Sequence, residues 1–192
     1  MRFYFDFLGC RLNEAEIANW RRAIEGRGEL VDDPENADVI TLNTCAVTGE
    51  AARKSRRQLR QFAKKNPSAH LIATGCYATL EPQKTADLLG VDMVLENSNK
   101  DQFLSKVSTA LSWGAKPKAA MSPNAQPAFA QNRTRAFVKV QDGCRNKCSY
   151  CIVTIARGNE KSRKIDDICS EINHLSDLGY QEVVLAGVHL GG

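Results

Sequence analysis

The stretch that decides the fold is residues 39–76, which read VITLNTCAVTGEAARKSRRQLRQFAKKNPSAHLIATGC. Apolar runs at 39–42 and 70–74 have the length and composition of buried strands. The segment between them has apolar residues at helical spacing, with Thr48 as its expected N-cap and Pro67 just after its end. A strand, a helix and a second strand in this order predict a βαβ unit with parallel strands.

The same alternation of strand and helix patterns continues on both sides of this unit. Apolar runs at 3–8 and 91–95 predict strands, and periodic segments predict helices after Asn13, at 81–89 and at 100–113. Strands that alternate with helices predict an α/β fold with a parallel sheet covered by helices on both faces. The carboxyl ends of all its strands then lie at one edge, where such sheets bind ligands.

Composition places the chain among ordinary globular proteins. Of its 192 residues, 43% are hydrophobic and 25% charged, which excludes disordered, collagen-like and coiled-coil chains. No apolar run approaches the roughly 18 residues of a membrane span, and residues 1–6 lack the apolar core of a signal peptide. Seven cysteines, an odd number, disfavour a disulfide scaffold and favour metal or redox chemistry. We therefore expect a cytoplasmic protein without a membrane anchor.

A second unit follows a segment with the composition of a linker. Residues 114–134 contain three prolines and show no apolar periodicity. After it, a strand at 136–140, a helix at 165–178 and a strand at 183–186 predict one further βαβ crossover. Two strands cannot complete a domain, so this unit is expected to be truncated. The expected division is a domain at 1–113, the linker at 114–134 and a truncated domain at 135–192.

Three cysteines lie directly after predicted strands of the first unit. They are Cys10, Cys45 and Cys76, and glycine precedes the first and the last of them. Because parallel strands end at one edge, we expect the three thiols to converge there and to share a metal site. Each one taken alone could instead be a buried core thiol.

Cys144, Cys148 and Cys151 form a C-x3-C-x2-C motif in the loop after the strand at 136–140. Three thiolates at this spacing can bind three irons of a [4Fe–4S] cluster and leave the fourth iron open, because full ligation takes four cysteines. An open position is what a catalytic metal needs for substrate or cofactor. The alternative is a zinc ion completed by a histidine, such as His174 or His189.

The seventh cysteine, Cys169, lies between Ile168 and Ile172 in the predicted helix at 165–178, so it is expected in the core. The three histidines, which include His70, need no metal to explain them.

Basic side chains are concentrated in two segments next to the cysteine motifs. Residues 46–75 contain seven lysines and arginines and only one acid, and bases also dominate 131–164. Both segments are compatible with an anionic partner such as nucleic acid. The alternative is a solvated helix face.

Several short motifs are spread over the whole chain. They are Gly9-Cys10-Arg11-Leu12-Asn13, Asn43-Thr44-Cys45-Ala46-Val47-Thr48, Gly75-Cys76-Tyr77, Gln141-Asp142-Gly143-Cys144, the cysteine triplet that follows, Ala156-Arg157-Gly158 and Gly187-Val188-His189-Leu190-Gly191. Together they resemble the motifs of the radical S-adenosylmethionine (SAM) methylthiotransferase family over essentially the whole chain. Within that family the chain looks closest to the branch that acts on N6-threonylcarbamoyladenosine in tRNA.

The resemblance implies an enzyme with two [4Fe–4S] clusters. Cys10, Cys45 and Cys76 would bind an auxiliary cluster in a methylthiotransferase domain. The C-x3-C-x2-C motif would bind the cluster that chelates SAM at the start of a radical SAM (βα) partial barrel. An electron from a donor would cleave SAM to a 5′-deoxyadenosyl radical, which removes hydrogen from adenine C2 of the nucleoside. Sulfur, methylated by a second SAM, would then be delivered from the auxiliary cluster.

The resemblance also implies smaller roles. Tyr150 would lie near the SAM adenine, or pack as an aromatic beside the cluster. Ala186 and Gly187 end the second strand, where the superfamily contacts the SAM amino group, although a glycine there could equally be a plain turn. Asn13 and Asn43 would brace the auxiliary-cluster loops, or serve as a helix cap or turn residue.

Three further positions bear on the radical-cluster loop. Arg157 and Arg163 would order this loop or meet phosphate. The family usually has proline where this chain has Thr154, so the loop is expected to be looser. As the family's later barrel strands and RNA-binding domain are absent, weak or no methylthiolation by this chain alone is expected.

Alternative functions stay open from the sequence. The substrate could be isopentenyladenosine in tRNA or an aspartate of a ribosomal protein. The chain could also be a non-catalytic module that binds metal or RNA.

Overall fold

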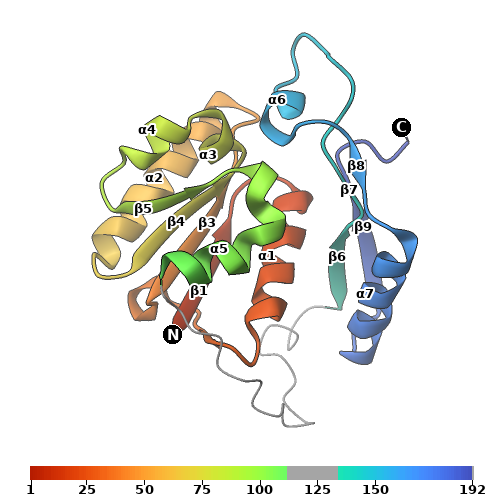
Figure 1. Ribbon diagram of the computed structural model, residues 1–192, viewed down its shortest axis with the longest axis horizontal. Helices are drawn as coiled ribbons and strands as arrows, with labels where there is room; N and C mark the ends of the chain where they lie inside the picture. Colours follow the sequence, from red (N-terminus) through yellow and green to blue (C-terminus); the bar gives the residue numbers. More distant parts are fainter. Residues whose placement is uncertain (112–133, 192) are drawn as a thin grey trace.

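The computed structural model describes residues 1–111 and 134–191 (Figure 1). The first range contains the strands β1 (Arg2–Phe7), β2 (Glu29–Leu30), β3 (Val39–Thr44), β4 (His70–Gly75) and β5 (Val91–Leu95). Its helices are α1 (Arg11–Ile24), α2 (Gly49–Lys65), α3 (Cys76–Leu80), α4 (Pro82–Ala86) and α5 (Phe103–Ala110), with 3-10 turns η1 (Pro34–Asn36) and η2 (Asn97–Gln102). The second range contains β6 (Arg135–Lys139), β7 (Gln141–Asp142), α6 (Val153–Arg157), β8 (Lys161–Ser162), α7 (Ile165–Asp177) and β9 (Glu182–Ala186).

The five strands of the first range form one sheet in the order β2-β1-β3-β4-β5, and every neighbouring pair is parallel. The predicted α/β fold with a parallel sheet is therefore confirmed. Strands β1, β3 and β4 lie side by side, with Phe7 opposite Asn43 and Thr44 opposite Gly75 at their carboxyl ends. These three ends are the ones that carry the cysteines.

Alternating strand residues face two separate cores. On one face, Phe3, Val39 and Ile72 pack with residues of α1 and α5, where the Trp20 and Phe103 rings stack with centroids 4.2 Å apart. On the other face, Ile40, Leu42 and Leu71 pack with Leu59 and Phe62 of α2 and with Ala78 of α3. Figure 1 shows these two helical layers around the sheet. Burial on both faces explains why the strands read as near-continuous apolar runs.

The second range forms the predicted βαβ crossover. Strands β6 and β9 are parallel neighbours, and α7 connects them and contributes Leu175, Ile168 and Ile172 to a small core. The antiparallel pair β7 and β8 closes the loop that holds the C-x3-C-x2-C motif. This unit packs against α1 of the first, where the Arg11 guanidinium lies 4.7 Å from the centre of the Phe137 ring.

Several local predictions are corrected by the structure. The helix expected after Asn13 begins at Arg11, so Asn13 lies inside it. The helix expected at 81–89 is shorter, since α4 begins at Pro82 and ends at Ala86, and the short helix α3 that precedes it from Cys76 was not expected. The helix expected at 100–113 starts as the 3-10 turn η2 and continues as α5, and its last two residues lie outside the described residues.

The linker expected at 114–134 also lies outside the described residues, apart from Thr134. Within the ranges that the structure describes, no helix is both long and apolar enough to cross a membrane.

Candidate metal centres

The first cysteine triad lies at the carboxyl edge of the five-stranded sheet. Cys10 follows β1, Cys45 follows β3 and Cys76 follows β4, and these strands are neighbours. All three thiols are free, with Cys45 and Cys76 buried and Cys10 exposed. The strand order therefore brings the three cysteines to one edge of the sheet, as expected.

Two glycines let the cysteine loops approach each other this closely. Gly9 has φ +96°, and a Cβ built there would lie 2.5 Å from Cys45 Sγ. Gly75 also has φ +96°, and its Cβ would collide with the backbone of Thr44. Burial raises the pKa of the Cys45 thiol, and the neighbouring Cys76 and Cys10 thiolates raise it further. The three sulfur groups therefore share one electrostatic environment.

The second triad lies in the loop between β7 and α6. Cys148 is exposed, and Cys144 and Cys151 are half-buried. The loop is fixed by backbone bonds, since Cys144 N donates to Gly158 O over 3.1 Å and Cys151 N donates to Cys148 O over 3.1 Å. The three thiols thus lie on a short, anchored loop with at least one open to solvent.

Thr154 contributes to this anchoring. Its hydroxyl donates to Asn146 O over 2.7 Å, a bond that a proline at this position could not make. The looser loop expected from the absent proline stays a prediction, and this bond acts against it.

Within the described ranges, no three His, Cys, Asp or Glu side chains converge on the position of a single metal ion. A cubane cluster makes a different demand, because each thiolate binds a different iron. Each triad supplies three thiols, the number that a cubane with one iron left open takes.

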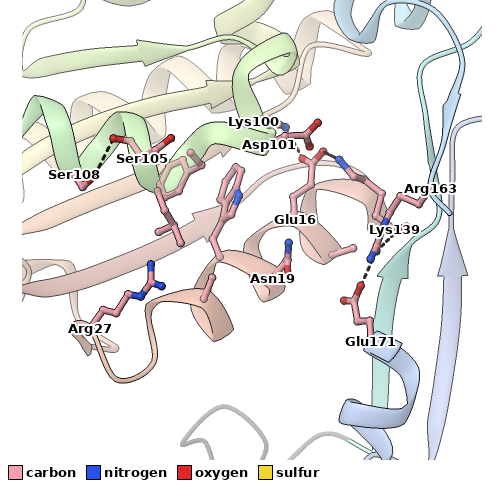
Figure 2. Close-up of a pocket in the computed structure, with 15 residues that line it drawn as sticks. Glu16, Asn19, Arg27, Lys100, Asp101, Ser105, Ser108, Lys139, Arg163 and Glu171 are labelled. Carbon is pink, nitrogen blue, oxygen red and sulfur yellow. Dashed lines mark hydrogen bonds and ion pairs between the residues drawn. The ribbon is translucent and has the colours of Figure 1, made fainter. Parts of the chain in front are cut away.

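A network of charged side chains, buried at its centre, connects the two units. At its centre is Glu16 of α1, 4% exposed, which pairs with Lys100 of η2 and, at 3.2 Å each, with Lys139 of β6 and Arg157 of α6. Asp142 also pairs with two of these cations, with Lys139 at 3.2 Å and with Arg157 at 2.9 Å. We call these five residues the Glu16 network, and Figure 2 shows Glu16, Lys100 and Lys139 in it.

The charges in this network depend on one another. Burial alone would raise the pKa of the Glu16 carboxyl, but Lys100, Arg157 and Lys139 hold it well below its ordinary value of 4.5. Burial likewise opposes the charge on Arg157, yet Glu16 and Asp142 raise the pKa of this guanidinium above its ordinary value. Removing Glu16 would leave Lys100 without its carboxylate partner, and Lys139 and Arg157 with Asp142 alone.

Asparagine side chains tie the network to the cysteine loops. Asn13 donates to Leu8 O over 2.7 Å and to Thr44 O over 3.1 Å, while its Oδ1 accepts from Arg157 over 2.6 Å. Asn43 donates to Glu16 over 2.9 Å and accepts from Lys100 over 3.0 Å. These are bonds to backbone and network groups of the loops that carry Cys10 and Cys45, so both asparagines brace those loops rather than serve as helix caps.

A third asparagine, Asn97 of η2, joins the two cysteine regions directly. Its Nδ2 lies 3.9 Å from Cys76 Sγ and donates to Ala156 O of α6 over 2.5 Å. Helix α6 begins two residues after Cys151. One side chain therefore contacts both a ligand candidate of the first triad and the helix that follows the second.

The two arginines expected to order the radical-cluster loop are both engaged within the protein. Arg157 is only 2% exposed in its side chain and is held by Asn13, Glu16 and Asp142. This is an ordering role, in which both terminal nitrogens of the guanidinium are bound to protein groups. Arg163 donates to Lys139 O over 2.8 Å and to Glu171 over 2.6 Å, and Glu171 also binds Arg22 of α1.

Gln141 brings the end of β9 to the second triad. Its Nε2 donates to Gly143 O over 2.7 Å, and its Oε1 accepts from Val188 N over 2.7 Å and from His189 N over 3.0 Å. Ala186, the buried last residue of β9, accepts from Val140 N over 2.9 Å, and Gly187 lies against the Gln141 side chain. A Cβ on Gly187 would collide with the Leu190 side chain. Close packing against Leu190 therefore accounts for a glycine at this position as well as contact with SAM would.

One sequence interpretation is wrong, and the role of Tyr150 stays a prediction, since this residue is 90% exposed in the protein alone. Cys169 is exposed rather than in the core, because Ile168, Ile172 and Leu175 occupy the inward face of α7. Its neighbours in sequence misled the prediction, since adjacent helical positions point about 100° apart.

A cavity of about 640 Å³ opens on the outer side of the Glu16 network, between α1, η2, α5 and the second unit (Figure 2). Glu16, Lys100 and Lys139 form one end, and Trp20 and Phe103 form an aromatic wall. A second cavity of about 480 Å³ continues past Lys139. The crevice between the two units is thus lined by charged side chains as well as by the aromatic wall.

The central residues of this arrangement were not singled out from the sequence. Glu16 and Lys100 read as ordinary surface charges on helices, and only their burial gives them a role. One signal was present, since Glu16 lies one turn beyond Asn13 on the face that carries Trp20.

Comparison with protein families matches residues 2–96 to the model described as "Uncharacterized protein family UPF0004". This range covers the whole five-stranded sheet and the first cysteine triad.

Curated relatives match nearly the whole chain. "Threonylcarbamoyladenosine tRNA methylthiotransferase MtaB" of Chlamydia pneumoniae is 36% identical over 96% of this chain and 42% of its own length. The protein of the same name from Bacillus subtilis is 35% identical over 98% of this chain and 44% of its own length. "tRNA-2-methylthio-N(6)-dimethylallyladenosine synthase" of Thermodesulfovibrio yellowstonii is 33% identical over 96% of this chain and 44% of its own length. The chain spans less than half the length of these relatives.

Proposed function

Because this chain belongs to the methylthiotransferase family, we propose that it functions in radical SAM methylthiolation of tRNA, at adenine C2 of N6-threonylcarbamoyladenosine. The observation that carries this proposal is the physical connection between the two cysteine triads. Asn97 contacts both Cys76 and α6, and Arg157 reaches from α6 to Asn13 in the first unit. A reaction that needs a radical source and a sulfur source beside one substrate needs two centres held together in this way.

The donor sets suit two [4Fe–4S] clusters. Cys10, Cys45 and Cys76 would hold one, and the C-x3-C-x2-C motif would hold the other, each with one iron left without a cysteine. When bound, the clusters and SAM supply the electron transfer, the radical that abstracts hydrogen, and the sulfur that is transferred.

The protein's own residues orient these groups and limit water. Gln141 holds the end of β9 against Gly143, which would place Ala186 and Gly187 at the amino group of SAM on the second cluster. Tyr150, exposed between Cys148 and Cys151, is available to lie against the SAM adenine. Glu16 and Lys100 are buried, so the centre of the Glu16 network is shielded from water.

The partners follow from this function. We propose a tRNA substrate, SAM and an electron donor, and a location in the cytoplasm where tRNA is available. The names of the MtaB relatives support the threonylcarbamoyladenosine branch, at 33–36% identity in three of them.

Mass spectrometry of tRNA nucleosides tests the proposed function directly. Cells in which the gene is deleted should lose 2-methylthio-N6-threonylcarbamoyladenosine and accumulate the unthiolated nucleoside. Restoring the gene should restore the product, and restoring a Cys148→Ala gene should not, because that loop would lose one of its three thiolates.

Other outcomes assign other functions. Loss of the methylthiolated isopentenyladenosine instead would assign the branch represented by the Thermodesulfovibrio relative. Loss of methylthiolation on a ribosomal protein aspartate would assign a protein substrate. An unchanged set of nucleosides and proteins, together with stoichiometric zinc in the purified protein, would favour a non-catalytic metal or RNA-binding module.

A further inference from the structure

The outer face of α2 carries basic side chains that nothing in the described protein neutralises. Four of them share one stripe and are exposed, and none forms an ion pair with a carboxylate of residues 1–111 or 134–191. They are Arg53, Arg57, Arg60 and Lys64, which we call the α2 stripe. The helix has seven basic residues and one acidic residue, so its own net positive charge is larger than the +4 of the whole chain. The rest of the chain is therefore on balance acidic.

The geometry of the stripe is regular. Spacings of four, three and four residues keep its side chains within about 60° of one another around the helix axis and extend over about 16 Å. The buried residues Ser55, Leu59 and Phe62 lie on the opposite side of the helix. The stripe therefore faces away from the sheet as a linear array of positive charge.

The stripe is also fixed in position relative to the first cysteine triad. Ser55 Oγ accepts from Cys45 N over 3.0 Å and donates to Cys45 O over 2.9 Å. The Arg56 guanidinium lies 5.5 Å from the centre of the Tyr77 ring, next to Cys76. The array thus begins at the cysteine edge and runs away from it along α2 (Figure 1).

We propose that the α2 stripe binds the phosphate backbone of the tRNA substrate and directs the target nucleoside to the cysteine edge. This inference rests on the proposed function. Arginine, which supplies three of the four cations, binds phosphate through two parallel N–H donors. No large hydrophobic side chain of α2 is among the exposed ones of the described residues, whereas a helix that binds a membrane presents apolar residues.

The test compares two variants with the same change in charge. The stripe variant carries Arg53→Gln, Arg57→Gln, Arg60→Gln and Lys64→Gln. The control carries Lys54→Gln, Lys65→Gln, Lys84→Gln and Arg135→Gln, four exposed cations that already have carboxylate partners, two of them on α2 itself. Circular dichroism and iron content of the reconstituted proteins check that both variants fold and load clusters as the parent does.

Binding of fluorescein-labelled tRNA is measured by anisotropy between about 50 and 200 mM KCl. We expect the stripe variant to bind at least about 10-fold more weakly, with a salt dependence reduced by about 3 in the slope of log K against log [KCl], since each phosphate contact contributes about 0.7–0.9. The control should stay within about 2-fold of the parent at the middle of this range, because it retains all four proposed contacts.

Three results would overturn the inference. The first is that the stripe variant and the control weaken tRNA binding equally. The second is that the stripe variant binds tRNA as tightly as the parent does. The third is that the parent binds vesicles of phosphatidylserine and phosphatidylcholine through the stripe but does not bind tRNA. In each case, the nucleoside measurement above still decides the proposed function separately.

Discussion

Glu16→Gln is expected to lower the free energy of unfolding by about 3–5 kcal/mol, the range found when one partner of a buried ion pair is removed. The substitution keeps the size of the side chain and removes only its charge. Lys100 and Arg157, which are 3% and 2% exposed in their side chains, would then remain buried with much less compensation. Urea denaturation of the reduced chain, followed by circular dichroism, measures the change.

Two controls separate this effect from a general loss of charge. Glu50→Gln removes a carboxylate from the exposed pair with Lys54 and should cost less than about 1 kcal/mol. Combining Glu16→Gln with Lys100→Met removes both charges, so the double variant should be more stable than the sum of the single changes predicts. Equal effects of Glu16→Gln and Glu50→Gln would show that the network does not hold the units together.

Gly75→Ala is expected to destabilise the protein by about 4 kcal/mol and to prevent cluster binding at the first triad. Gly75 has φ +96° and ψ −169°, a conformation that is nearly confined to glycine, and its Cβ would also collide with the Thr44 backbone. The strand β3 cannot move away without disturbing Cys45, which follows Thr44. Urea denaturation and the iron content after anaerobic reconstitution measure the two effects.

Gly158→Ala is the matched control for this clash. Gly158 has φ +74° and ψ −161°, close to the values of Gly75, but a Cβ there meets nothing within 4 Å. It should therefore show only the backbone strain, about 2 kcal/mol. Gly49→Ala, at an ordinary φ and in open space, should be nearly neutral. If Gly75→Ala cost no more than Gly158→Ala, the close packing of the cysteine loops would be disproved.

The strand-end cysteines could be predicted because their signal is local. A run of apolar residues that ends in a cysteine predicts both a strand and the position of the thiol, and parallel topology then brings Cys10, Cys45 and Cys76 to one edge. The Thr48 cap is of the same kind, since its hydroxyl accepts from Ala51 N over 3.1 Å as expected.

The Glu16 network could not be predicted because its partners are far apart in the sequence. Glu16 is separated from Lys100 by 84 residues and from Arg157 by 141. No periodicity or motif relates such positions, and each charge by itself is typical of a helix surface. The short elements β7, β8 and α6 were missed for a related reason, since elements of two to five residues leave almost no pattern.

The central claim is that this chain holds two separate iron–sulfur clusters, one on each cysteine triad. Anaerobic reconstitution with iron and sulfide, followed by iron and sulfide analysis, tests it most directly. The parent should bind about eight irons, as two cubanes of four, and each of two triple variants should bind about four. One variant replaces Cys10, Cys45 and Cys76 with alanine, and the other replaces Cys144, Cys148 and Cys151. A triple variant that retains all of the parent's iron, or a parent that binds only about four irons in total, would contradict the account.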